Sequence, residues 1–261
     1  MARNIESRQG SIPASLTPQE VQRLGDEYEK RSAQDVLAWV LATYGSRFAL
    51  SSSFGAEDVV LIDMLWRVNP KARVVTLDTL RLHRETYEVM ARIRDKYGIK
   101  LEVFSPEPKA AEEMVARHGL DLMYESIENR KLCCHIRKVE PLERALAGLD
   151  AWGTGLRRQQ ASTRTGVRKV EIDEARPSKV KVNPIADWTS EQVWDYIRKN
   201  QVPYNALHDR GYPSIGCEPC TRVVKPGEDP RAGRWWWEQD PAGKECGLHV
   251  ADKLPRPQVR L

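Results

Sequence analysis

Residues 47–66 read RFALSSSFGAEDVVLIDMLW, and this stretch decides the fold class. Residues 47–52 predict a short strand, the letters SSFGAED predict a loop, and residues 58–66 predict a helix. The pattern places hydroxyls, a glycine and main-chain N–H groups at a helix N-terminus, where anions bind readily. It is not a Walker A loop, because the sequence GK[ST] is missing. An ordinary serine-rich capped turn would leave the same pattern.

The alternation of strand and helix continues on both sides of this stretch. Further strands are predicted at residues 73–77, 100–104, 150–154 and 179–182. Helices are predicted at residues 17–44, 85–97, 108–117, 138–149 and 189–200, with Thr17 and Thr189 as N-caps. Strands that alternate with helices indicate an α/β fold, in which a parallel sheet carries helices on both faces.

The pattern also predicts how the chain is divided. Residues 1–16 predict a disordered arm, and residues 17–203 predict an α/β nucleotide-binding domain that includes the first cysteine pair. Residues 204–261 are rich in Pro, Gly, Arg and Trp and have little periodicity. We expect them to form an irregular C-terminal segment that takes its order from the main domain or from a metal.

Composition excludes several classes of protein. The 261 residues suffice to bury a core, and 30% of them are charged. No apolar run reaches the roughly 20 residues of a membrane span, so a membrane protein is excluded. The first residues, MARNIESRQGSIPAS, lack the apolar run of a secretory signal, and we therefore expect a cytoplasmic protein.

The net charge of +4 is small but unevenly distributed. Residues 130–170 contain ten Lys and Arg and three Asp and Glu, a local charge of +7, so the remainder sums to −3. Such a stretch indicates a small polyanion or nucleic acid as a partner. A solvated helix face is the plainer interpretation.

The chain has five cysteines, an odd number. In a reducing cytosol they are more typical of metal binding or catalysis than of disulfides. Cys133-Cys134 and Cys217-Glu-Pro-Cys220 could supply four thiolates to zinc or to an iron–sulfur cluster, and their spacing supports both about equally. Adjacent side chains reach one centre only through a local backbone adjustment, and the separate corners of a 4Fe-4S cube accept such a pair more readily. Buried structural thiols are the weaker alternative.

The remaining polar candidates lie in the tail and at strand ends. Cys246 has the basic neighbours Lys244 and His249, which lower a thiol pKa and favour a nucleophile, although a lone cysteine is often an inert buried thiol. The carboxyl ends of parallel strands line the ligand crevice of such sheets. Asp78 and Thr79 follow the second predicted strand at this edge, and Arg157, Arg158 and Arg164 could clamp a phosphate there or form a solvated basic loop.

Eight segments, taken in order, resemble one family. They are SFGAEDVVL (53–61), LDTLRLHRETY (77–87), ENRKLCCHIRKVEPLERAL (128–146), WGTGLRRQQ (152–160), NPIADWT (183–189), VPYNALHDRGYPSIGCEPCTR (202–222), PGEDPRAGRWWWE (226–238) and KECGLH (244–249). Together they resemble the assimilatory, thioredoxin-dependent adenylyl-sulfate (APS) reductases, the iron–sulfur type within the PAPS/APS reductase family.

The resemblance implies a fold, a cofactor and a nucleophile. The fold is of the adenine-nucleotide α-hydrolase (PP-loop) type, and the loop keeps only one glycine, Gly55, which suits a substrate that brings no pyrophosphate. The resemblance also implies one 4Fe-4S cluster and the nucleophile Cys246, with no fingerprint for flavin or NAD. The implied cluster ligands are Cys133, Cys134, Cys217 and Cys220.

The resemblance further implies the reaction. The Cys246 thiolate attacks the sulfur of APS, AMP leaves, and the resulting S-sulfocysteine is cleaved to sulfite in sulfate assimilation and cysteine biosynthesis. Because the other four thiols are held by the cluster, an external dithiol, thioredoxin or glutaredoxin, must supply the electrons. The positions implied for the phosphosulfate end are Lys138, Arg231, Arg234 and His249. Those for the AMP part are Ser51, Ser52, Ser53, Gly55, Asp78, Thr79, Arg81, Arg157, Arg158 and Arg164.

Several alternatives stay open on the sequence. The substrate could be 3′-phospho-APS (PAPS) or both nucleotides, with the basic residues 157–169 holding the extra phosphate. A PP-loop tRNA-thiolating enzyme with a metal site would use the basic stretch but should carry a fuller SGGxDS-type loop. A non-catalytic metal-containing nucleic-acid module leaves Cys246 without a role. We expect no nucleic acid or membrane partner, a homo-oligomer (dimer or tetramer), and an electrostatic role for the cluster in which Lys138 bridges to substrate.

Overall fold

The computed structural model describes residues 16–238 and 247–248. Its sheet has six strands in the order β3-β2-β1-β4-β6-β5. The strands are β1 (Phe48–Ser52), β2 (Arg73–Leu77), β3 (Leu101–Phe104), β4 (Ala151–Gly153), β5 (Val170–Asp173) and β6 (Arg176–Val182). All neighbouring strands pair in parallel except β5, which forms an antiparallel edge beside β6. The predicted α/β class is confirmed.

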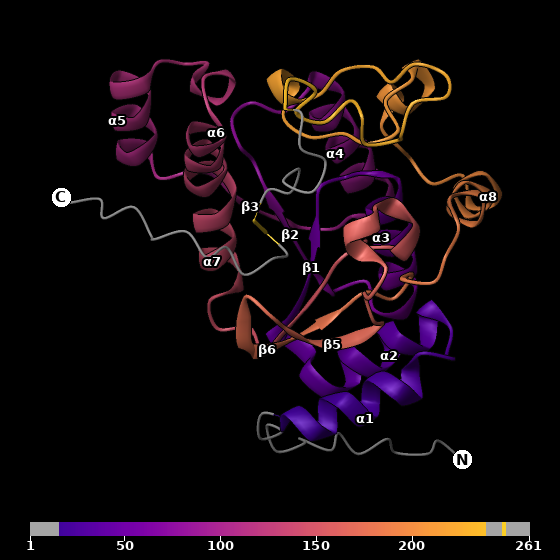
Figure 1. Ribbon diagram of the computed structural model, residues 1–261. Coiled ribbons are helices and arrows are strands. Elements are labelled where there is room, and N and C mark those ends of the chain that lie inside the picture. Colours follow the sequence, from indigo (N-terminus) through magenta and orange to yellow (C-terminus); the bar gives the residue numbers. More distant parts are fainter. Residues whose placement is uncertain (1–15, 239–246, 249–261) are drawn as a thin grey trace, which may run out of the picture.

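Helices cover both faces of this sheet (Figure 1). The α-helices are α1 (Pro18–Tyr28), α2 (Ala33–Tyr44), α3 (Ala56–Val68), α4 (Arg84–Tyr97), α5 (Pro108–His118), α6 (Ile127–Cys134), α7 (Glu140–Leu146) and α8 (Ser190–Asn200). Successive strand residues point to opposite faces, so Leu50 packs into the large core with α2, α3 and α8. Its neighbour Ala49 packs instead into a smaller core with α7.

Three elements differ from the sequence prediction. Helix α6 (Ile127–Cys134) is not predicted by the sequence pattern. Residues 17–44 form two helices, because Ser32 caps α2 in a capping box with Asp35 after α1 has ended. The predicted cap Thr17 does start α1 in the same way. Strand β5 is not predicted by the sequence pattern, and it extends the sheet as a hairpin that turns back into β6.

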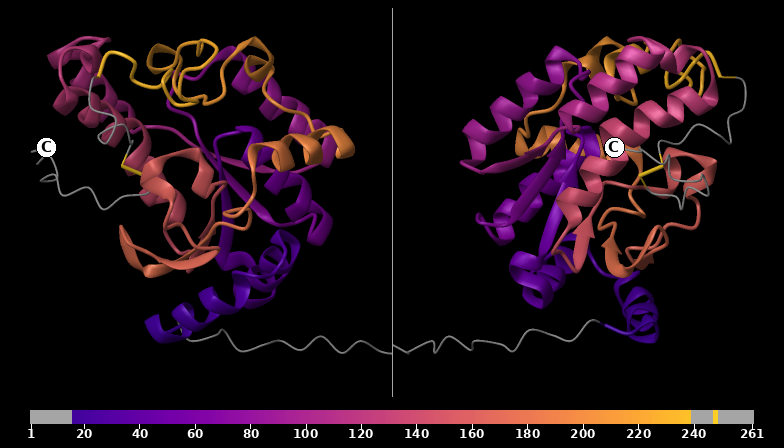
Figure 2. Two further views of the ribbon diagram at one scale, coloured as in Figure 1. Left: turned by 45° about the vertical axis from the view of Figure 1, so that its right-hand side comes forward. Right: turned by 90° about the vertical axis from the view of Figure 1, so that its left-hand side faces the viewer.

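The segment after α8 is irregular, as predicted. It contains the short turns Ala206–Arg210 and Glu218–Cys220 and isolated bridges that join Leu82 to Cys217 and Thr221 to Arg234. Figure 2 shows this orange and yellow segment at the same end of the molecule as α5 and α6. It therefore forms a cover over the loops that follow the parallel strands.

A membrane-spanning helix is not found within residues 16–238 and 247–248. The predicted arm lies outside these residues except for Leu16, which packs against the large core.

Candidate active site

A cavity of about 720 Å³ lies at the carboxyl ends of β1, β2 and β4. Its floor comes from the loop after β1, and its cover comes from the segment after α8. This volume is in the range of small-molecule and nucleotide sites, and the position is where ligands bind in parallel α/β sheets. The cavity is therefore the candidate active site.

Most of the predicted site residues line this cavity. The loop and strand-end positions are Ser51, Ser52, Ser53, Gly55, Thr79, Arg157 and Arg164. The predicted phosphosulfate-binding cations Lys138, Arg231 and Arg234 line it as well. The fold thus brings together side chains from positions 51 to 234.

Three predicted nucleotide contacts are absent from the described lining of the cavity. Asp78 instead accepts hydrogen bonds from the Leu80 N–H and the Tyr87 hydroxyl, each at 2.8 Å. Its carboxylate is used to shape the turn after β2, which is why it does not face the cavity.

The other two are arginines engaged elsewhere. Arg81 pairs with Asp121 at 3.0 Å and lies in the wall of a second cavity. Arg158 donates to the Val167 carbonyl at 2.8 Å and pairs with Glu29, the C-cap of α1. Both guanidiniums therefore stabilise the packing of neighbouring segments.

The loop after β1 is held by a buried carboxylate. Asp58 accepts from the main-chain N–H and the hydroxyl of Ser53, the latter at 2.8 Å. Burial raises the pKa of Asp58 to about 6, against the Ser53 hydrogen bonds, which lower it. Phe54 takes a left-handed conformation with φ of 59°, stabilised by an N–H bond to the Ser52 hydroxyl at 3.1 Å. The Ser52 and Ser53 hydroxyls thus stabilise the loop through hydrogen bonds within the protein.

The Arg157 guanidinium also forms an ion pair within the protein. Its Nη2 lies 2.7 Å from Glu57 of α3, and its side chain is 7% exposed. A Cβ at Gly155 would lie 2.4 Å from the Asp58 carboxylate, so only glycine allows the segment after β4 to approach α3 this closely. The edge of the cavity is therefore rigid and nearly charge-balanced at this point.

The predicted cysteine ligands gather around the second cavity. Cys133 and Cys134 end α6, Cys217 and Cys220 come from the irregular segment, and all four are buried thiols outside any disulfide that line this cavity. A π-helical turn, His135–Val139, follows directly, and such turns are frequent at functional sites. This is the kind of backbone adjustment that the tandem pair predicts.

The thiols influence one another electrostatically. Burial raises the pKa of Cys220 to about 11, with a further contribution from the negative charge of Cys217. Burial opposes ionisation of Cys217 too, but Lys138 and a hydrogen bond with Thr79 at 3.3 Å lower its pKa. Among residues 16–238 and 247–248, no three His, Cys, Asp or Glu side chains are grouped as around a single metal ion.

Lys138 and Trp235 line both cavities and form the wall between them. The Arg234 guanidinium lies 4.8 Å from the Trp235 ring and donates to the Ile215 carbonyl at 3.3 Å. It also lies flat against Gly216, where a Cβ would come within 2.3 Å of the Arg234 Nη2. A cationic, aromatic partition therefore separates the thiols from the larger cavity.

The predicted nucleophile Cys246 and His249 lie outside the described residues. Leu248, between them in the sequence, lines the large cavity. The sequence pattern missed Trp235, because burial alone distinguishes it among the three consecutive tryptophans 235–237. It also missed Gly155 and Gly216, the two glycines at which a Cβ would clash with a neighbouring side chain, because no local motif marks them.

Comparison with known proteins places this architecture in a family. The phosphoadenosine phosphosulfate reductase domain matches residues 47–223. The chain belongs to this family. The resemblance noted in the sequence is thereby confirmed, since the match spans the loop after β1, the tandem cysteines and the second cysteine pair.

Members of this family include close curated relatives. The chain is 51% identical to an adenosine 5′-phosphosulfate reductase of Burkholderia cepacia over 221 residues, which cover 84% of this chain and 88% of the relative. It is 47% identical over 244 residues to one of Pseudomonas aeruginosa, covering 92% and 90%. By name these relatives are reductases, so they are oxidoreductases.

Solved structures agree with the fold. A phosphoadenylyl-sulfate reductase from Candida auris, in a phosphate complex, has a TM-score of 0.69 at 30% identity and covers 81% of this chain and 99% of that one. An FMN adenylyltransferase from Candida glabrata has a TM-score of 0.51 at 14% identity, covering 86% and 84%, and shows the fold alone. The predicted PP-loop type of fold is confirmed.

Proposed function

We propose that this chain reduces adenosine 5′-phosphosulfate to sulfite and AMP, with Cys246 as the nucleophile. The observation that carries the proposal is the set of residues that line one cavity. It is lined by the loop after β1, by the cations Lys138, Arg231 and Arg234, and by Leu248, two positions after Cys246 in the sequence. A nucleotide, its phosphosulfate and a tail thiol are the set of reactants that such a cavity suits.

The first step transfers the sulfonate to the enzyme. The Cys246 thiolate forms a bond to the sulfur of APS, and the bond from that sulfur to the phosphate oxygen breaks with its electron pair on AMP. AMP is a stable phosphate leaving group, so no strong general acid is needed. The product on the enzyme is S-sulfocysteine.

The second step releases sulfite and uses an external dithiol. One thiolate of thioredoxin or glutaredoxin attacks the Cys246 sulfur, sulfite leaves with the electron pair, and a mixed disulfide remains. The second thiol of the same reductant attacks that disulfide, which restores Cys246 and leaves the reductant oxidised. Both electrons come from the dithiol, so no flavin or NAD is required.

The cations reduce the electrostatic repulsion that opposes the first step. A thiolate must approach a phosphosulfate that already carries two negative charges, and preorganised positive groups lower that barrier. Lys138, Arg231 and Arg234 line the cavity from two different elements. We assign them to the phosphosulfate end, with His249, and we assign the residues at the loop edge to AMP.

We further propose that Cys133, Cys134, Cys217 and Cys220 hold one 4Fe-4S cluster. The donor set fits: four buried thiols line one cavity, and Arg81, Arg130, Arg137 and Lys138 lie in its wall to offset the charge of thiolate ligands. When bound, the cluster supplies a fixed, polarisable charge behind the partition. Lys138, which faces both cavities, is positioned to couple that charge to the sulfonate.

Cellular setting follows from this chemistry. A cluster on four thiols and a catalytic thiol need a reducing compartment, so we assign the chain to the cytoplasm and to assimilatory sulfate reduction leading to cysteine. We assign it to a homo-oligomer, a dimer or tetramer, on the family resemblance alone. No nucleic acid or membrane enters the proposal.

Intact mass spectrometry tests the proposal directly. Purified protein is incubated with APS without reductant, and we expect a gain of one sulfonate that maps to Cys246. The variant Cys246→Ser should gain none, and thioredoxin should remove the group and release sulfite. An unmodified protein after incubation with APS would contradict the proposal.

PAPS is the second candidate substrate. The Candida auris relative is named for PAPS, and Arg164 gives the cavity a cation beyond the phosphosulfate group. The same mass experiment with PAPS decides between strict and dual use. A tRNA-thiolating function is disfavoured because the basic stretch is paired internally, through Arg158–Glu29, Arg168–Asp26 and Lys169–Asp187.

A further inference from the structure

Strand β6 begins with a buried arginine that the proposed reaction does not use. The Arg176 side chain is 6% exposed and lies 2.7 Å from Glu143 of α7 and 3.2 Å from Asp173 of β5. Asp173 is itself fully buried and accepts the indole N–H of Trp152 at 2.9 Å. The Arg176 guanidinium also lies 5.7 Å from the Trp152 ring. Two carboxylates and an indole therefore fix this guanidinium in one orientation.

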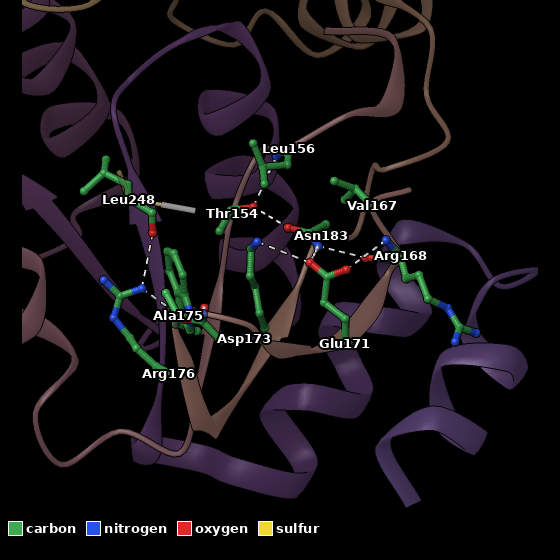
Figure 3. Close-up of polar contacts among 12 residues, drawn as sticks. Thr154, Leu156, Val167, Arg168, Glu171, Asp173, Ala175, Arg176, Asn183 and Leu248 are labelled. Carbon is green, nitrogen blue, oxygen red and sulfur yellow. Dashed lines mark hydrogen bonds and ion pairs between the residues drawn. The ribbon is translucent and has the colours of Figure 1, made fainter. Parts of the chain in front are cut away.

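The fixed guanidinium contacts the C-terminal tail (Figure 3). Arg176 Nη1 donates to the main-chain carbonyl of Leu248 at 3.2 Å. The Leu248 side chain packs against the smaller apolar core, which includes Val75, Leu146 and Trp152. Separate contacts thus hold the main chain and the side chain of Leu248 on the body of the protein, beside the cavity that Leu248 lines.

We propose that Arg176 is a positioning residue for catalysis: by holding Leu248, it docks the tail at the cavity. The inference rests on the proposed function, in which Cys246, two positions earlier in the chain, is the nucleophile. Arg176 is not among the described residues that line the cavity, so it acts on the substrate only through the tail.

The chain offers a matched control for this contact. Arg73 on β2 donates to the Glu102 carboxylate at 2.7 Å and to the Ser46 carbonyl at 2.8 Å. These are the same kinds of bond that Arg176 makes, but they join other parts of the fold. Arg73→Ala therefore measures the general cost of removing such an arginine.

The experiment compares full-length Arg176→Ala, Arg176→Lys, Leu248→Ala and the double Ala variant. Three quantities are measured: the single-turnover rate of Cys246 S-sulfonation by APS, the rate of Cys246 alkylation by iodoacetamide, and the affinity for AMP. Leu248→Ala keeps the accepting main-chain carbonyl and removes the packed side chain, so it tests the second contact of the same segment and still decides the matter if Arg176→Ala fails to fold.

We expect each single Ala variant to slow S-sulfonation about tenfold, because the thiol is held less well. Alkylation of Cys246 should become about threefold faster, because an undocked segment is more accessible. AMP affinity should stay within about twofold of wild type, and the double variant should be at least as slow as the slower single variant, since the two substitutions remove separate contacts of one segment. Arg176→Lys, which keeps a donor, should recover part of the S-sulfonation rate.

Unchanged alkylation and S-sulfonation in Arg176→Ala and Leu248→Ala would overturn the inference. It is overturned equally if the slower S-sulfonation comes with weaker AMP binding or appears to the same extent in Arg73→Ala. If wild type forms no adduct with APS, the proposed function fails. The alkylation rates then still decide whether Arg176 docks the tail.

Discussion

The Asp58 carboxylate holds the loop after β1 through hydrogen bonds, but burying its negative charge lowers the stability of the fold. It accepts two hydrogen bonds from Ser53, and burial nevertheless raises its pKa to about 6 from an ordinary value of 3.8. The folded protein therefore binds this proton more tightly than the unfolded chain does. Between about pH 4 and pH 6 the contribution of Asp58 to stability falls as pH rises, and above pH 6 the full penalty applies.

We predict that Asp58→Asn removes this pH dependence while keeping an acceptor for the Ser53 N–H. Relative to wild type, the variant should gain stability from pH 4 to pH 7, by about 3 kcal/mol for a pKa shift of roughly two units. Urea unfolding across this pH range measures the difference.

Asp35→Asn is the control of opposite sign. Hydrogen bonds from Ser32 lower the pKa of Asp35, so its stabilisation is present above the ordinary pKa and is lost as pH falls. Parallel stability profiles for wild type and Asp58→Asn would contradict the assignment.

Two glycines show how the neighbouring atoms decide the effect of one methyl group. At Gly155 a Cβ would meet the Asp58 carboxylate at 2.4 Å and the Glu57 Cβ at 2.9 Å, both on α3. At Gly216 the three atoms nearest to a Cβ all belong to the guanidinium of Arg234, with its Nη2 at 2.3 Å. The first clash opposes the packing of the fold, whereas the second can be relieved by moving one side chain.

We predict that Gly216→Ala lowers activity with little loss of stability. The displaced Arg234 should slow S-sulfonation about tenfold, equivalent to about 1.4 kcal/mol of transition-state stabilisation. Gly155→Ala should instead destabilise the protein by about 1–3 kcal/mol, as overpacking does. Thermal unfolding and single-turnover rates of both variants test the contrast, and a large drop in melting temperature for Gly216→Ala would refute it.

At the scale of elements, the sequence predicted what local signals encode. Strand β2 has the predicted bounds, and α8 starts after its predicted cap Thr189. Strand β5 was missed because Val170–Asp173 is a short run whose strand character comes from pairing with β6.

The site was predictable to the same degree. The cysteine pairs and cations stand out by residue type and spacing, and the fold does bring them together. Asp78, Arg81 and Arg158 are not among the described residues that line the cavity, and a sequence cannot reveal which acid or carbonyl a side chain pairs with. Their partners Tyr87, Asp121 and Glu29 lie between 9 and 129 positions away.

The π-helical turn His135–Val139 gives the next prediction, because it places Lys138 between the two cavities. Lys138→Gln keeps a long polar side chain but removes the charge. S-sulfonation should slow at least about tenfold, since a preorganised cation is lost from the sulfonate end. AMP affinity should change less, because AMP lacks that end.

Lys131→Gln provides the matched comparison. Lys131 lies on α6, one short stretch before the turn, and is not among the described residues that line either cavity. Its loss should leave the S-sulfonation rate near that of wild type. Equal effects of the two substitutions would show that overall charge, rather than the position of Lys138, is what matters.

At the scale of the whole molecule, the basic stretch of residues 130–170 is divided between ion pairs inside the fold and the lining of the cavity. Much of its charge is neutralised by acids far away in the sequence, including Asp26 of α1 and Glu29, the C-cap of that helix. Lys169 is 3% exposed and pairs with Asp187 at 2.8 Å. The excess charge therefore joins α1 to the sheet, and only part of it reaches the cavity.

The longest-range of the buried ion pairs described here is Arg130–Glu238, which spans 108 positions. The side chains are 1% and 4% exposed and make bonds of 2.8 and 3.0 Å, and Arg130 also lies 4.8 Å from the Trp235 ring. The pair thus ties the irregular segment to α6, across the cavity that holds the cysteines. A buried pair of this kind is costly to break but contributes little over an apolar replacement.

We predict that Glu238→Met destabilises the protein by about 3–5 kcal/mol, because the Arg130 charge is left buried without its partner. Arg130→Met should lower the free energy of unfolding by a similar amount, because the Glu238 carboxylate is then left buried without its partner. The double Met variant should recover most of that loss. Denaturant unfolding gives the stabilities, and iron bound per chain reports on the cysteine cavity. If the double variant loses as much stability as the two single variants combined, the ion pair itself holds the segment in place. The pairing of the two charges then matters more than their burial. If the double variant recovers both stability and iron, packing around Trp235 is what keeps the two cysteine pairs together.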